Sequence, residues 1–96
     1  MYEIAPLLDD PLHNLKTIRD IYRWAITEME TAEISFGHGC NDSFEESSFL
    51  ICRALKLPFE HFDEFLDAAL THNELLRLVN LIDRRVHEKT PSAYLL

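Results

Sequence analysis

A histidine and a cysteine beside the only two glycines of the chain are the first residues whose chemistry we weigh. His38 and Cys40 are separated by a single residue. Imidazole and thiolate are the ligands that zinc prefers, but Cys52, His61 and His72 are too scattered for zinc-finger spacing, and paired Cys-x-x-Cys units are absent. We therefore predict no metal site and expect His38 to bond the local backbone of a turn.

A catalytic cysteine requires a thiol whose pKa is lowered and a base that is held in place. Cys40 is close to His38 and precedes a predicted helix start, which favours the thiolate. The sequence supplies neither a third catalytic group nor a substrate cleft. A regulator that uses His38 and Cys40 as a metal site or a reactive thiol is a further hypothesis, which zinc addition and thiol titration would test. Cys52 falls on the inner face of a predicted helix, and we interpret it as core filling.

Carboxylates form one dense acidic patch in the chain. They are Glu60, Asp63, Glu64 and Asp67, which helical spacing places on one side of a short helix. Such a cluster usually forms a solvated helix face. It also attracts basic proteins, and we therefore name these four residues as candidate contacts with a partner.

Three other side chains are candidate contacts with a partner or a second domain. Trp24 is the single tryptophan, and it lies at the edge of an apolar helix face, where it either packs peripherally or anchors a partner. Tyr94 belongs to an apolar ending, which predicts that the chain continues into something that covers it. His38 is included for its place in the glycine turn.

Composition limits the class of protein. At 96 residues and 47% hydrophobic content, the sequence predicts one ordered domain. Nine basic and 17 acidic residues give a formal net charge of -8, which opposes direct nucleic-acid binding and favours a basic protein partner. No signal peptide, membrane span or glycine-rich phosphate loop is visible, and the two cysteines form no disulfide framework. We expect a cytoplasmic protein that does not contact membranes.

Apolar spacing and capping residues predict an all-α fold, a small bundle of four main helices. The first helix is expected to begin at Asp10-Pro11, to end near Ala32 and to lie at the centre of the bundle. Residues Met1 to Leu8 are expected to form an irregular arm or a short extra turn. The glycine segment is expected to form a sharp reversal before the second helix.

The other helices are predicted from similar signals. The second is expected from about Phe44 to Lys56, with a capping box formed by Ser43 and Glu46. Its expected inner face is Phe44, Ser48, Ile51, Cys52 and Leu55. A short third helix is expected to place Phe62, Phe65, Leu66 and Ala69 on one side. The fourth should open with a capping box at Thr71-x-x-Glu74 and end before Thr90-Pro91. Its core face is predicted to be Leu75, Leu78, Val79, Ile82 and Val86, with Arg84, Arg85 and Lys89 gathered near its end to complement the helix dipole.

Motifs in a fixed order resemble a known family. They are Thr17-Ile18-Arg19-Asp20, Arg23-Trp24-Ala25, Phe36-Gly37-His38-Gly39, Leu57-Pro58, Thr71-x-x-Glu74, Arg84-Arg85-Val86-x-Glu88 and Pro91-x-Ala93-Tyr94-Leu95. From about residue 17 to the end, the chain resembles the N-terminal domain of HemK-type protein glutamine methyltransferases. It is most similar to the branch, known as the PrmB type, that modifies the third protein of the large ribosomal subunit. It departs from that pattern at Cys40-Asn41-Asp42, where the family usually has Thr-Asp-Asn, and at Phe62, where a proline is common.

The resemblance implies a function that the composition alone does not. Such enzymes join a helical domain to a C-terminal domain that binds S-adenosylmethionine and carries an Asn-Pro-Pro-Tyr loop, and this sequence contains neither that loop nor a catalytic or cofactor-binding residue to carry over. We expect residues 1–91 to be the substrate-recognition domain for a basic ribosomal protein. Residues 92–96 are expected to begin the linker to the enzyme's own catalytic domain. The alternative is a free-standing acidic helical adaptor for a basic protein.

Overall fold

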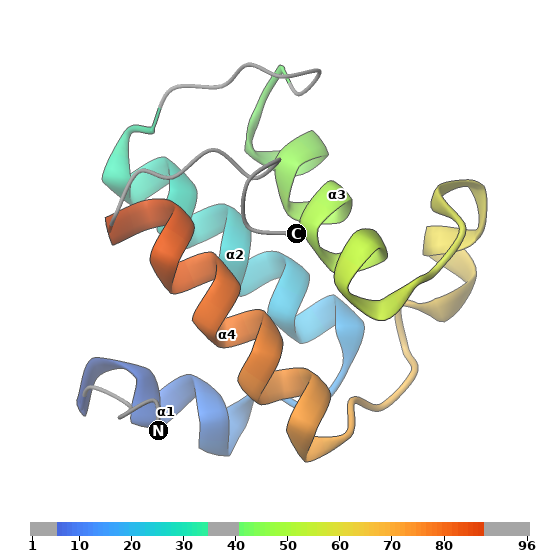
Figure 1. Ribbon diagram of the computed structural model, residues 1–96, viewed down its shortest axis with the longest axis horizontal. Helices are drawn as coiled ribbons and strands as arrows, with labels where there is room; N and C mark the ends of the chain where they lie inside the picture. The colour runs from blue at the N-terminus through green and yellow to red at the C-terminus, as the bar shows by residue number, and fades with distance from the viewer. Residues whose placement is uncertain (1–5, 35–40, 88–96) are drawn as a thin grey trace.

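The computed structural model describes residues 6–34 and 41–87, and these residues form a helical globule. Its elements are α1 (Pro6–Asn14), α2 (Ile18–Ala32), α3 (Ser43–Leu55), the 3-10 helix η1 (Phe59–Phe65) and α4 (His72–His87), as Figure 1 shows. Within the described ranges, the only β-type pairing is an isolated bridge between Thr17 and Ala69. The predicted all-α class is confirmed.

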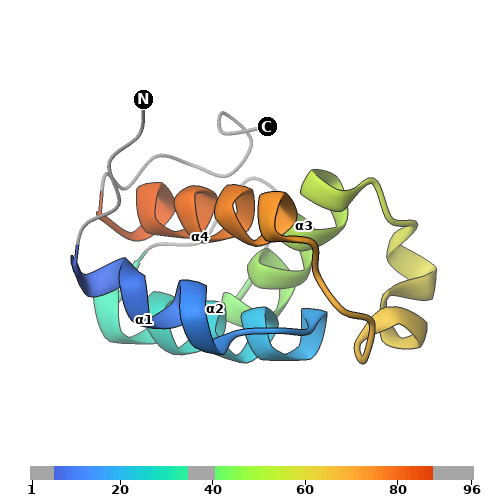
Figure 2. The ribbon, with the colours of Figure 1, turned by 90° about the horizontal axis from the view of Figure 1, so that it is seen from below.

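Helix α2 lies at the centre of the bundle, as predicted, and packs against both α3 and α4. Its buried residues are Ile18, Ile21, Ala25 and Met29. Leu50 and Ile51 of α3 and Leu78, Val79 and Ile82 of α4 complete a core that is closed to water. Figure 2 shows α1 and α2 in one layer, with α4 above them.

The predicted first helix is in fact two helices, α1 and α2. The predicted helix is interrupted at Thr17. The Thr17 hydroxyl accepts a hydrogen bond from the Asp20 amide at 3.2 Å. The Asp20 carboxylate in turn accepts from the amides of Lys16 and Thr17 at 2.9 and 3.0 Å. This capping box starts a new helix at Ile18. Of the two alternatives for Met1 to Leu8, the irregular arm is wrong from Pro6 onward, and an extra N-terminal helical element is present, since α1 begins there and contains Pro11.

Helix α3 begins one residue earlier than predicted and is capped differently. Asp42, not Ser43, is the N-cap, and its carboxylate accepts the Glu45 amide at 2.9 Å. Glu46 therefore takes no part in capping. Phe44 is 54% exposed, so its predicted place on the inner face is wrong. The buried residues of this helix are Ser43, Glu46, Ser47, Ser48, Leu50, Ile51, Cys52 and Ala54.

The predicted third helix is the single 3-10 segment η1. Only Phe62 of its predicted apolar side is buried, and its ring meets Tyr22 edge to face with 5.1 Å between centroids. Phe65 is 41% exposed and Ala69 is also exposed, which corrects the predicted packing.

The loop after η1 is bonded to the start of α2. The amides of Ile18 and Arg19 donate to the carbonyls of Ala68 and Leu66 at 3.1 and 2.7 Å, and the Leu70 amide donates to Lys16. Amides of a first helical turn lack partners within their own helix. The loop supplies the missing acceptors and fixes η1 against α2.

The predicted start of α4 is confirmed. The Thr71 hydroxyl accepts the Glu74 amide at 3.1 Å, and the Glu74 carboxylate accepts the Thr71 amide at 2.9 Å. The predicted core residues of the helix, Leu75, Leu78, Val79, Ile82 and Val86, are all buried. The glycine turn and the C-terminal residues, with His38, Cys40, Lys89 and Tyr94, lie outside the described residues.

Candidate functional site: an acidic row and a basic pocket

The acidic cluster of η1 divides into two rows because a 3-10 helix repeats every three residues. Glu60 and Asp63 form one row of η1, His61 and Glu64 form the other, and Asp67 follows in the turn after the helix. All four predicted carboxylates are exposed. The single acidic stripe expected from α-helical spacing is therefore absent, although the four residues do share one small region.

The two rows differ in their internal partners. Glu64 bonds the His61 ring, and Asp67 accepts from the Arg19 guanidinium at 3.0 Å. No ion pair within residues 6–34 and 41–87 involves Glu60 or Asp63. The row of Glu60 and Asp63, which we call the acidic row, thus keeps its charge available to an external cation.

Exposed phenylalanines lie at both ends of η1. Phe59 is 60% exposed and Phe65 is 41% exposed, and each is followed or preceded by carboxylates of the cluster. An aromatic ring attracts a cation held over its face, and exposed aromatics are enriched where proteins meet. Carboxylates next to exposed rings therefore suit Lys and Arg side chains with their alkyl stems.

Trp24 is half-buried and packs against the hydrophobic core from α2. This position agrees with peripheral packing and leaves part of the ring available. Nearby on the same helix, burial raises the pKa of the Tyr22 phenol above its ordinary value, and the charges of Asp42 and Asp63 raise it further. Asp63 is thus electrostatically linked to the core helix beneath it.

An ion pair that the sequence did not predict lies between α3 and α4. Arg85, expected to be at the helix end for its charge, is 5% exposed and bonds the Glu46 carboxylate through two of its nitrogens. Ser43, one turn earlier, donates to Glu30 of α2 at 2.8 Å. The sequence analysis missed this pair because it assigned Glu46 to a capping box at the start of the helix.

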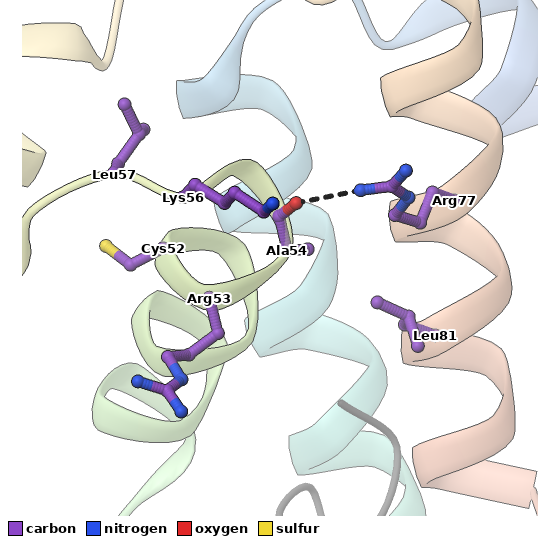
Figure 3. A pocket seen from close by; sticks show the side chains of 7 residues that line it. All are labelled: Cys52, Arg53, Ala54, Lys56, Leu57, Arg77 and Leu81. Carbon is purple, nitrogen blue, oxygen red and sulfur yellow. Dashed lines mark hydrogen bonds between the residues drawn. The ribbon is translucent and has the colours of Figure 1, made fainter.

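A pocket of about 610 Å³ opens between the end of α3 and the middle of α4. Figure 3 shows its lining residues, which are Cys52, Arg53, Ala54, Lys56, Leu57, Arg77 and Leu81. Arg77 reaches from α4 and donates to the Ala54 carbonyl at 3.0 Å. Lys56 adopts the left-handed backbone conformation that ends α3, and the Leu57 amide closes the turn by donating to Cys52. We call this site the basic pocket.

The thiol in the basic pocket is not activated. Cys52 is 3% exposed, and burial raises the pKa of its thiol above the ordinary value. A protonated thiol is a poor nucleophile and a poor metal ligand. Its interpretation as core filling is confirmed by its burial, and the described part of the chain holds no group of three or more His, Cys, Asp or Glu that is arranged for a metal.

None of the helices in the described ranges has the length and apolar character needed to cross a bilayer.

Comparison with curated proteins identifies homologues of the chain. It is 41% identical over 81 residues to the ribosomal protein uL3 glutamine methyltransferase of Bordetella pertussis, and 39% identical over 80 residues to that of Burkholderia pseudomallei. These matches cover 84% and 83% of the chain. A relative of the same name in Neisseria meningitidis is 35% identical over 89 residues, which is 93% of the chain.

The predicted resemblance to protein glutamine methyltransferases is thereby confirmed. The chain spans only about a quarter of these relatives, with 27% of the Bordetella protein matched. No protein-family model and no solved structure matched the chain.

Proposed function

We propose that this homologue of the ribosomal protein uL3 glutamine methyltransferases is the N-terminal substrate-recognition domain of such an enzyme. The full-length protein would act in the cytoplasm on a glutamine side-chain amide of a large-subunit ribosomal protein. Its C-terminal domain would bind S-adenosylmethionine and carry out methyl transfer. The helical domain would bind and position the protein substrate without contributing a catalytic residue.

The observation that carries the proposal is the similarity over 81 residues to enzymes of this name. It covers most of the chain but only about a quarter of each relative, which is the pattern expected of one domain within a longer enzyme. The charge of the domain supports the same role. A ribosomal protein that binds RNA is rich in Lys and Arg, and a domain of net charge -8 attracts such a partner.

The acidic row is the surface we assign to the substrate. Glu60 and Asp63 are exposed and have no cation bound within the described part of the chain, whereas Glu64 and Asp67 already contact His61 and Arg19. A substrate cation gains more from an unpaired carboxylate than from one it must share. Phe59 adds an exposed ring directly beside Glu60.

The test is a binding titration of the chain with uL3 from the same organism at several salt concentrations. We expect the affinity to fall steeply as salt rises, because exposed charges are screened. The double variant Glu60→Gln/Asp63→Asn should raise Kd about tenfold, if each contact contributes about 0.7 kcal/mol. Glu64→Gln/Asp67→Asn is the matched control and should raise Kd less.

In the full-length enzyme the same variants separate binding from chemistry. Loss of a binding contact raises KM for uL3 and leaves kcat unchanged, whereas damage to the catalytic step lowers kcat. Product is measured by mass spectrometry of the methylated glutamine. Unchanged affinity in the Glu60/Asp63 variant would refute the assignment of the acidic row. Failure of uL3 to bind at all would favour the adaptor hypothesis.

A further inference from the structure

The basic pocket concentrates positive charge on an acidic protein. Arg53, Lys56 and Arg77 are three of the nine basic residues in the chain, and all three line it, whereas no acidic side chain does. Within residues 6–34 and 41–87, none of the three forms a salt bridge. Like charges gathered without a counter-charge favour binding of an anion.

Contacts within the pocket hold part of this charge in place. The bond from Arg77 to the Ala54 carbonyl uses one of the five N–H donors of the guanidinium and leaves the others available. In Figure 3, Lys56 and Arg77 extend toward that carbonyl from opposite sides, whereas Arg53 points away along α3. Arg53 lies over the Phe49 ring, 5.9 Å from its centroid. Two cations therefore converge at the mouth, and the third flanks it.

The rest of the lining is apolar. Leu57, Leu81, Ala54 and Cys52 supply hydrocarbon and a neutral thiol beside the cations. A pocket of about 610 Å³ has room for several side chains and exceeds what a small inorganic ion fills. The lining therefore places cations beside an apolar surface.

We propose that the basic pocket binds an acidic protein segment, in which a carboxylate side chain meets Lys56 and Arg77 and a neighbouring leucine-like side chain lies against Leu57 and Leu81. This role is separate from the proposed recognition of a basic substrate by the acidic row. Arg and Lys bind carboxylates through charge-assisted hydrogen bonds. Nucleic acid is disfavoured as the occupant, because its many phosphates would be repelled by the net charge of -8.

The test is titration of the chain with an acetylated and amidated peptide of alternating Glu and Leu, followed by calorimetry and backbone amide NMR. Arg77→Gln and Lys56→Gln should each weaken binding about tenfold, as expected for loss of one charge-assisted contact. Within the described residues the Lys56 side chain forms no hydrogen bond or ion pair, so its variant should keep the fold even if loss of the Arg77 bond perturbs α3. Arg23→Gln, which removes an exposed cation outside the pocket, should leave Kd unchanged.

Three probes separate the outcomes. We expect the Glu-Leu peptide to bind with amide shifts confined to the end of α3 and the middle of α4, which line the pocket. A peptide with Gln in place of Glu should not bind. Inorganic phosphate and a single-stranded oligonucleotide should bind more weakly than the Glu-Leu peptide. Equal or tighter binding of phosphate or oligonucleotide, equal loss in Arg23→Gln, or no binding of the Glu-Leu peptide would each overturn the proposal.

Discussion

At the scale of single residues, Glu46 and Arg85 form an ion pair inside the core. Both side chains are almost completely buried, and they connect α3 to α4. Burial removes two charges from water, and their mutual contact offsets that cost only while both are present. The pair is therefore expected to specify how the two helices meet more than to add stability.

Replacing one member of this pair tests that account. Glu46→Ala removes the Glu46 carboxylate from the buried Arg85 guanidinium, and the free energy of unfolding should fall by about 3 kcal/mol. Urea denaturation monitored by circular dichroism measures the change. Glu45→Ala, one residue earlier and exposed, is the control and should lose at most about 1 kcal/mol. A loss of similar size in both variants would contradict the role of the buried pair.

The capping carboxylate of α2 predicts a dependence of stability on pH. Bonds from the backbone amides of Lys16 and Thr17 lower the pKa of Asp20 below its ordinary value. Because the folded state favours the ionised carboxylate, its contribution is complete above the pKa of the unfolded chain and is lost as pH falls through the folded value.

The variant Asp20→Asn removes this titration. At neutral pH it should lower the free energy of unfolding by about 1 kcal/mol. The difference from the natural chain should shrink as the solution is acidified below pH about 4. Urea denaturation across pH provides the measurement, and a difference that grows on acidification would refute the assigned sign.

At the scale of elements, the sequence predicted helices well where the capping residues were clear. Thr71 and Glu74 gave the start of α4 because their spacing fits a capping box and an apolar face follows. The break before Ile18 was missed because Leu15 continues the apolar spacing across it, and only the bonds of Thr17 and Asp20 reveal a new helix start.

Two other features depend on contacts between distant residues and were missed for that reason. Glu46 fits a capping position in sequence, and its partner Arg85 becomes evident only when α3 and α4 pack together. The cations of the basic pocket lie on α3 and α4 and are likewise separated along the chain. The acidic cluster was found from local density, but its division into rows required the 3-10 geometry of η1.

The phenylalanines of η1 provide a matched test of this geometry. Phe62 is 7% exposed and contacts Tyr22, whereas Phe59 is 60% exposed. Phe62→Ala should lower the free energy of unfolding by about 3 kcal/mol, and Phe59→Ala should change it by less than about 0.5 kcal/mol. Thermal and urea denaturation measure both, and similar losses would show that the segment packs differently.

At the scale of the whole molecule, opposite charges occupy neighbouring regions. The part of the basic pocket that α3 contributes ends at Leu57, and the acidic row begins at Glu60, with Pro58 and an exposed phenylalanine between them in the sequence. A net charge of -8 attracts cations from a distance. The basic pocket, in contrast, is a small region of positive charge. The two proposed binding regions therefore carry opposite charge and are close together in the sequence.

The buried thiol of Cys52 gives a measure of global opening. In a Cys40→Ser variant, reaction with a thiol reagent should be far slower than for an unfolded control, because the folded chain buries Cys52 and raises its thiol pKa. The ratio of the two rates should follow the stability measured with urea. Rapid reaction in the folded chain would contradict the closed packing around α3.

The bonds between the start of α2 and the loop after η1 affect the order of folding during synthesis. Ile18 and Arg19 find their acceptors only at Ala68 and Leu66, which leave the ribosome much later than α2 itself. When α2 emerges, the amides of Ile18 and Arg19 therefore lack their final acceptors. These hydrogen bonds form only after α3 and η1 have also been synthesised. Assembly of this bundle should occur in one late, concerted step rather than helix by helix along the emerging chain.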